Sequence, residues 1–135
     1  MATREEFLHG VRQRLHTGRN EEAERAVRAV FQVLHRRLSA GQAGHIESHL
    51  PVELKREWDL HAFEDVARAL GGQAGWDEGE FLERVQSVGR YPDKQEALEA
   101  TQAVFGELKR VIPEKDARDT AAELPQGLRT VWQEA

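Results

Sequence analysis

The chain contains no cysteine and only four prolines among its 135 residues. Without cysteine there is no disulfide, no thiolate nucleophile and no zinc finger, and nothing favours an oxidising compartment. Long apolar runs are missing as well, since no stretch approaches the roughly 18 apolar residues of a membrane-spanning helix. The first residues also lack the apolar core of a signal peptide. We therefore expect a cytoplasmic protein without membrane contact.

The residues that are present suit a folded domain. The composition is 39% hydrophobic and 32% charged, which is apolar enough for a core and unlike a disordered chain. The formal net charge of −5 is spread unevenly. Residues 1–58 carry ten basic and eight acidic side chains, residues 59–77 one and four, and residues 78–135 eight and twelve. The two halves of the chain thus differ in the sign of their surface charge.

An internal duplication organises the chain. Residues 6–58 and 80–132 align without a gap and share 17 of 53 positions, where composition alone would give roughly four. Both copies contain A-V-F-x2-L, starting at Ala29 and Ala103, and L-P-x2-L-x3-W, starting at Leu50 and Leu124. Such self-similarity indicates one supersecondary unit used twice, and it decides how the other patterns are interpreted.

Each copy predicts four helices. Apolar residues recur at helical spacing, and start signals such as Thr3 with Glu6, Asn20 and Pro51 separate the segments. We expect helices over residues 4–15, 20–37, 39–50, 51–60, a connecting 61–70, then 78–88, 93–112, 113–123 and 125–132. The predicted fold class is all-α, with two tandem four-helix repeats (residues 1–58 and 78–135) joined by a connecting helix and hinge loop (residues 59–77), about nine helices in all.

The predicted core surrounds aromatic residues at matching places in the two copies. Phe31 and Phe105 lie within the long helices, and Trp58 and Trp132 follow the Leu-Pro corners. We expect all four to be buried, with the repeats packed side by side around a continuous apolar seam.

Two glycines distinguish the second copy from the first. Gly89 stands where the first copy has Leu15, and Gly106 replaces Gln32 inside the long helix. Glycine in a helix interior costs about 1 kcal/mol against alanine. We therefore expect the second repeat to be the more loosely packed.

The opening F-L-x2-V, the central A-V-F-x2-L and the closing L-P-x2-L-x3-W, each present twice, resemble the bacterial proteins catalogued as domain of unknown function 2267. The resemblance covers nearly the whole chain. It implies an all-helical tandem repeat and a bacterial source. Because that family has no established activity, the resemblance carries over no catalytic, cofactor-binding or metal-binding residue.

His45 and His49 are four residues apart, a spacing at which two imidazoles on one helix can share a metal ion. The intervening residues do not make the H-E-x-x-H pattern of a metalloprotease, and the second copy has Asp119 and Glu123 at these places. A solvent-facing polar strip explains the pair without a metal. We expect no metal site and no cofactor, and if a metal binds, a carboxylate from elsewhere in the chain completes the set.

No catalytic constellation is recognisable in the sequence. The other histidines show no triad order, and there is no glycine-rich phosphate loop and no serine in a nucleophile elbow. Carboxylates are many, but none forms a pair whose spacing separates an acid from a base. We therefore expect a protein that is not an enzyme.

The basic residues of the first copy suggest a possible interaction surface. Arg25, Arg28, Arg36 and Arg37 lie on the long helix, where arginines can meet phosphates. Glutamates are interleaved with them, so a solvated helix face with ion pairs also explains the pattern. Trp76 has no equivalent in the other copy, and it either packs between the copies or contacts a partner.

We expect a non-catalytic helical interaction or scaffold module, with a partner protein or self-association as its target. The alternative is a nucleic-acid-binding protein that uses the arginines of the first repeat. Metal binding through His45 and His49 ranks third.

Overall fold

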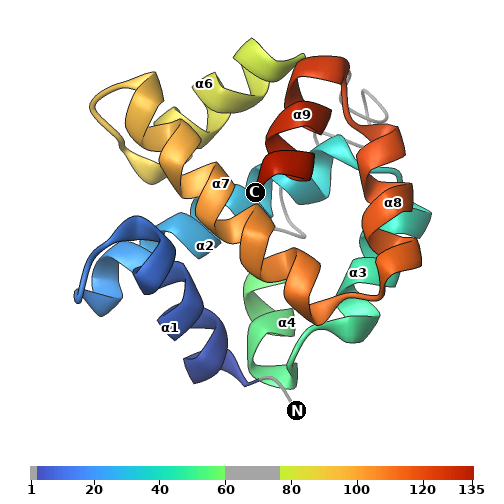
Figure 1. Ribbon diagram of the computed structural model, residues 1–135, viewed down its shortest axis with the longest axis horizontal. Coiled ribbons are helices and arrows are strands. Elements are labelled where there is room, and N and C mark those ends of the chain that lie inside the picture. The colour runs from blue at the N-terminus through green and yellow to red at the C-terminus, as the bar shows by residue number, and fades with distance from the viewer. Residues whose placement is uncertain (1–2, 60–76) are drawn as a thin grey trace.

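The computed structural model describes residues 3–59 and 77–135, and within these ranges all regular secondary structure is helical. The predicted connecting helix, the hinge loop and Trp76 lie outside the described residues. Eight helices follow one another (Figure 1): α1 Arg4–Leu15, α2 Asn20–Arg37, α3 Ala40–His49, α4 Val52–Asp59, α6 Glu78–Gly89, α7 Lys94–Val111, α8 Glu114–Glu123 and α9 Gln126–Glu134. The predicted all-α class with two four-helix repeats is confirmed.

Four of the described helices begin at a side chain that caps the first turn. Thr3, Ser39, Asp77 and Asp93 each accept a hydrogen bond from the backbone N–H three residues later, which satisfies one of the free donors of the first helical turn. The prediction that Asn20 caps α2 is wrong. The cap is Arg19, which makes no side-chain capping bond.

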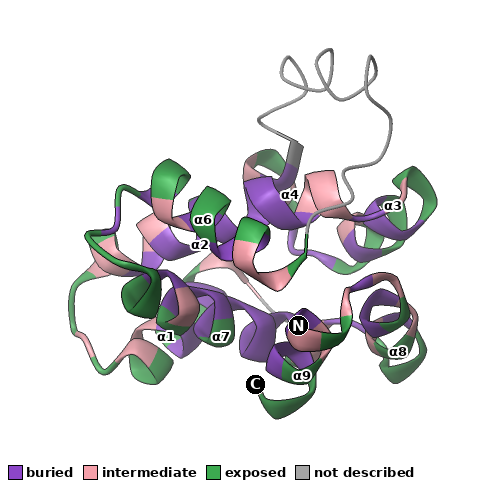
Figure 2. Cartoon of the chain, turned by 90° about the horizontal axis from the view of Figure 1, so that it is seen from above, coloured by how far each residue is buried: buried purple, intermediate pink, exposed green. Residues whose placement is uncertain are grey.

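The two long helices, α2 and α7, pack against each other at the centre of the molecule. Helix α1 packs on α2 of its own repeat and also on α7, and α6 packs on α7 and also on α2 (Figure 1). Helices α4 and α9 cover α2 and α7, and α3 meets α8 of the other repeat. Buried residues of both repeats therefore form one cluster, visible as the inward faces of the helices in Figure 2.

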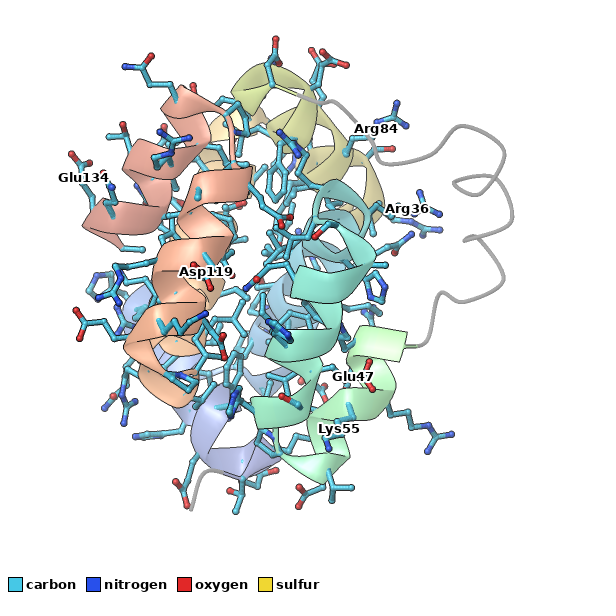
Figure 3. The ribbon with its side chains drawn as sticks, turned by 90° about the vertical axis from the view of Figure 1, so that its right-hand side faces the viewer. Arg36, Glu47, Lys55, Arg84, Asp119 and Glu134 are labelled. Carbon is cyan, nitrogen blue, oxygen red and sulfur yellow. The ribbon has the colours of Figure 1, made fainter. Side chains whose placement is uncertain are left out.

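Equivalent aromatic side chains hold each half of this core. Phe31 contacts Trp58 with ring centroids 5.2 Å apart, and Phe105 contacts Trp132 at 4.9 Å. Both contacts are edge-to-face, the geometry that ring quadrupoles favour. All four rings are buried, as predicted. Charged side chains such as those of Arg84 and Glu134 extend outward from the helices (Figure 3).

The expectation of a looser second repeat is wrong at both glycines. A β-carbon at Gly89 would overlap the ring of Tyr91, and one at Gly106 would overlap the guanidinium group of Arg14. Each glycine therefore leaves space for a neighbouring side chain. The alignment of the two copies gives no sign of these contacts. Both glycines are buried.

None of the described helices combines the length and the apolar character required to cross a membrane.

Candidate interaction cleft

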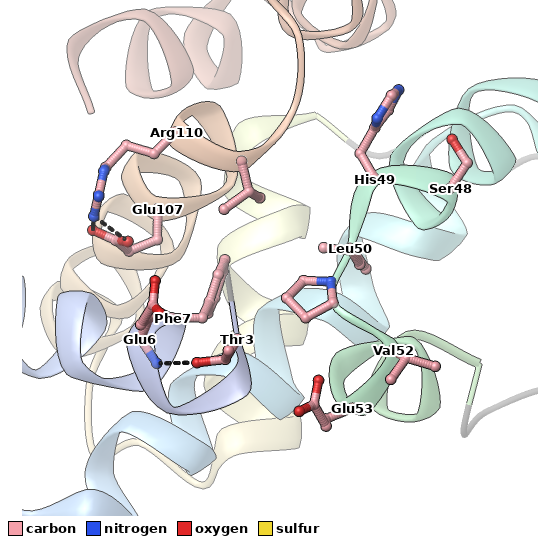
Figure 4. A pocket seen from close by; sticks show the side chains of 12 residues that line it. Thr3, Glu6, Phe7, Ser48, His49, Leu50, Val52, Glu53, Glu107 and Arg110 are labelled. Atoms are coloured by element: carbon pink, nitrogen blue, oxygen red, sulfur yellow. Dashed lines mark hydrogen bonds and ion pairs between the residues drawn. The ribbon is translucent and has the colours of Figure 1, made fainter. Parts of the chain in front are cut away.

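A cleft of about 770 Å³ opens where the first turn of α1, the corner between α3 and α4, and the end of α7 meet. Both repeats contribute to it, because α7 belongs to the second copy (Figure 4). The side chains that line it are Thr3, Glu6, Phe7, Ser48, His49, Leu50, Pro51, Val52, Glu53, Glu107, Arg110 and Val111.

The cleft has an apolar floor and an apolar side chain at its edge. Phe7 and Leu50 are core residues whose edges reach the cleft. Val52, at the start of α4, is 75% exposed, and Val88 at 37% is the other exposed large hydrophobic residue in the described part of the chain. The matching position in the second repeat is Gln126, which is also exposed. The fold therefore accepts a polar residue at this corner, and Val52 is not needed for folding.

A buried ion cluster forms the opposite wall. Glu107 is only 3% exposed, and its carboxylate accepts hydrogen bonds from Arg14 Nε at 3.0 Å and from Arg110 Nη1 at 2.9 and 3.3 Å. Gly10 on α1 leaves the space that this carboxylate fills. Two guanidinium groups thus balance one buried charge, as a buried carboxylate requires. The cluster joins α1 of the first repeat to α7 of the second.

Sequence reasoning missed Glu107 because one of its two partners, Arg14, lies in the other repeat. The only sign in the sequence is that an acidic residue interrupts an apolar run, with Phe105 and Gly106 before it and Leu108 after it. The equivalent residue of the first copy is Val33. The charge is therefore particular to the α1–α7 crossing and absent from the matching position in the other repeat.

His49 lies at the far end of the cleft and contacts the second repeat. Its Nε2 is 3.0 Å from Asp116 Oδ2, and His45 Nδ1 is 3.9 Å from Asp116 Oδ1. The Asp116 side chain is 12% exposed and lies on α8. His45 and His49 are both exposed, as a solvent-facing strip predicts, and the same edge of α3 also meets α8. This contact supplies the carboxylate from elsewhere that the metal hypothesis needs.

These three side chains are neighbours across the interface between α3 and α8. Within the described ranges, no group of three or more histidine, aspartate or glutamate side chains has an arrangement able to hold a metal ion. The same interface carries further polar contacts. Gln42 donates to Thr120 Oγ1 at 2.8 Å, and Ser39 donates to Glu123 from its backbone N–H and its hydroxyl, both at 2.7 Å. His45 and His49 thus belong to a polar interface between the repeats.

The structure divides the four arginines proposed as one surface. Arg25 and Arg28 lie beside the end of α6, where they line a small pocket with Arg90. Arg36 and Arg37 are half-buried at the end of α2, about 12 Å further along the helix axis from Arg28 at 1.5 Å per residue. No continuous four-arginine stripe results.

The family model described as "Uncharacterized conserved protein (DUF2267)" matches residues 4–75 and again residues 78–135. Each match contains one copy of the duplication, and together they cover nearly the whole chain. No curated protein matches the chain.

Proposed function

The chain belongs to the family of uncharacterized conserved proteins DUF2267, which supplies no activity, and we propose on physical grounds that it is a non-catalytic module that binds a partner protein in the cleft between its repeats. One observation carries the proposal: an apolar residue, Val52, is 75% exposed beside a cleft that both repeats build. A concave site with apolar residues at its floor and polar residues at its edge has the composition of an interaction surface.

The charges around the cleft indicate the chemistry of the partner. Glu6 and Glu53 are exposed on its two sides (Figure 4), whereas Glu107 is already balanced by arginines. Arg110 is the exposed cation. A segment with an apolar side chain for the floor, next to a basic side chain for Glu6 or Glu53, fits this arrangement. Burying Val52 then supplies up to about 1.5–3 kcal/mol of binding free energy.

Site-specific photocrosslinking in cells of the source organism tests the proposal. A photoreactive amino acid at Val52 should capture one discrete partner protein, which mass spectrometry identifies. The same probe at Gln126, the equivalent exposed position of the second repeat, should not capture it. Equal capture at both positions would contradict a specific cleft. Capture of a second copy of this chain at Val52 would identify self-association as the function.

Nucleic-acid binding is the second candidate, and it draws on the meeting of Arg25 and Arg28 with Arg90. Protein purified at low salt should then show excess absorbance at 260 nm that disappears at high salt, because phosphate contacts release counterions. A spectrum of pure protein at low salt, with no mobility shift of duplex or single-stranded DNA, would exclude this candidate.

A further inference from the structure

A second hollow, away from the cleft, lies between α2 and the end of α6. It has a volume of about 390 Å³ and is lined by Arg25, Arg28, Val88, Gly89 and Arg90. The two helices belong to different repeats and lie side by side (Figure 2). Three of its five lining residues are therefore arginines, drawn from both copies of the duplication. We call it the three-arginine pocket.

The three guanidinium groups are held to different degrees. Arg25 lies over the ring of Tyr91 at 4.4 Å from its centroid, and its Nη1 is 3.6 Å from Glu22. Its buried Nε has no hydrogen-bond partner. Burial raises the pKa of Tyr91, and the Arg25 charge partly opposes that rise. Arg25 is therefore positioned at the edge of the pocket by an aromatic ring.

Arg28 and Arg90 supply the uncompensated charge. Both are exposed, and neither makes an ion pair or a side-chain hydrogen bond with another residue in the described ranges. Arg90 has a φ of 57°, the left-handed region that favours glycine, and it ends α6. The chain thus keeps a long basic side chain at a place where backbone conformation alone would select glycine.

The duplication provides an internal comparison for this pocket. The equivalent hollow between α1 and α7, about 470 Å³, is lined by His16, Glu99 and Gln102, at the places of Arg90, Arg25 and Arg28, together with Arg14, Leu15, Ala103, Glu134 and Ala135. His16 also has a φ of 57°. The same backbone therefore forms with an acidic, an amide and an imidazole side chain. The arginines of the three-arginine pocket are not required by the fold.

We propose that the three-arginine pocket binds the phosphate group of a small molecule. Guanidinium groups form paired, charge-assisted hydrogen bonds with phosphate oxygens, and two of the three carry no competing carboxylate. Val88, 37% exposed, offers an apolar contact for the rest of the ligand. A polynucleotide fits less well, because Arg36 and Arg37 are half-buried further along α2 and do not extend the pocket into a basic track.

The test titrates the full chain with inorganic phosphate and monitors the backbone amide signals by NMR. A titration with chloride at the same ionic strength is the control. Phosphate should produce saturable shifts at Gly89 and Arg90. The variants Arg28→Gln and Arg90→His install the residues of the equivalent hollow, so they should fold, as their unchanged spectra elsewhere will show. Each should weaken phosphate binding at least tenfold. Arg118→Gln removes the same charge from an exposed position of α8 and should change binding less than twofold.

Three results would overturn the proposal. One is the absence of saturable shifts with inorganic phosphate. Another is equal weakening by Arg118→Gln, which would indicate a nonspecific charge effect. The third is binding of a duplex or single-stranded oligonucleotide that depends on Arg28 and Arg90 while phosphate and a phosphomonoester such as phenyl phosphate are inactive. That last outcome would assign the arginines to nucleic acid.

Discussion

At the scale of single residues, a glycine of each repeat packs against a charged side chain of the other repeat. Gly10 on α1 faces the carboxylate of Glu107, and Gly106 on α7 faces the guanidinium group of Arg14. Arg14 in turn bonds Glu107 at 3.0 Å. Each of the two helices thus has a glycine at the place where the other helix inserts a charged side chain. The ion pair sits inside the crossing of α1 and α7 because both glycines are there.

Gly10→Ala should therefore reduce stability, although alanine favours a helix by up to about 1 kcal/mol. The added β-carbon overlaps the Glu107 carboxylate, which two arginines hold in place, and overpacking of this kind costs about 1–3 kcal/mol. Denaturant unfolding measures the change. In a Glu107→Ala background the overlap is gone, so Gly10→Ala should then be neutral or stabilising.

Gly44→Ala is the matched control for this prediction. Gly44 is exposed within α3, and a β-carbon there meets nothing within 4 Å. The substitution should raise the free energy of unfolding by about 0.5–1 kcal/mol. If Gly10→Ala stabilises the otherwise unchanged chain as Gly44→Ala does, the tight crossing described above is wrong.

At the scale of helices, a side chain from the long helix of each repeat contacts the C-terminal carbonyl groups of the last helix of that repeat. Lys109 on α7 donates from Nζ to the carbonyl oxygens of Trp132 at 2.7 Å, Gln133 at 3.3 Å and Ala135 at 2.9 Å. At the matching place on α2, His35 Nδ1 lies 3.0 Å from the carbonyl oxygen of Trp58. A cation at a helix C-terminus satisfies carbonyls that have no helical partner and offsets the helix dipole.

Lys109→Met should lower the free energy of unfolding by about 1–2 kcal/mol, because it removes hydrogen bonds from a charged donor to the end of α9. Burial, with a smaller contribution from Arg14, lowers the pKa of Lys109, in line with its partly enclosed position. Chemical denaturation and the exchange rates of the α9 amides measure the effect. Lys115→Met is the control, since its exposed pair with Asp119 at 2.9 Å should contribute little. Equal effects of the two substitutions would contradict the capping role.

At the scale of the whole molecule, the two repeats are not independent domains, because they share one hydrophobic core. Helix α1 packs on α7, α6 on α2, and α3 on α8, so buried residues of either copy face the other. A separated repeat would expose apolar surface along α2 or α7, at a cost of about 25 cal/mol per Å². The repeats should therefore fold as one cooperative unit.

Residues 1–77 and residues 78–135, prepared as separate chains, should each lack a cooperative thermal transition by circular dichroism. Mixing them should restore helicity and a single transition, because the interface is rebuilt from both copies. The outcome that would contradict the shared core is a cooperative transition of either chain alone that mixing leaves unchanged. The full-length protein measured under the same conditions is the reference.

The duplication, the order of the helices and the buried aromatic residues follow from the sequence alone. Local rules suffice for these, since helical spacing, capping residues and Leu-Pro corners act within a few residues of the chain. Phe31, Phe105, Trp58 and Trp132 were recognisable as core because each recurs at a fixed offset in an apolar pattern.

Only the tertiary structure decided which side chains of one copy contact the other copy. The copies align residue by residue, yet Glu107 contacts Arg14, Asp116 contacts His49, and Arg90 lines one pocket with Arg25 and Arg28, at positions that the alignment leaves unrelated. Such contacts depend on how helices from different copies cross, and helical spacing along one chain contains no information on that crossing. For the same reason, Gly106 looked like a weakness in the sequence and proved to be the space that Arg14 fills.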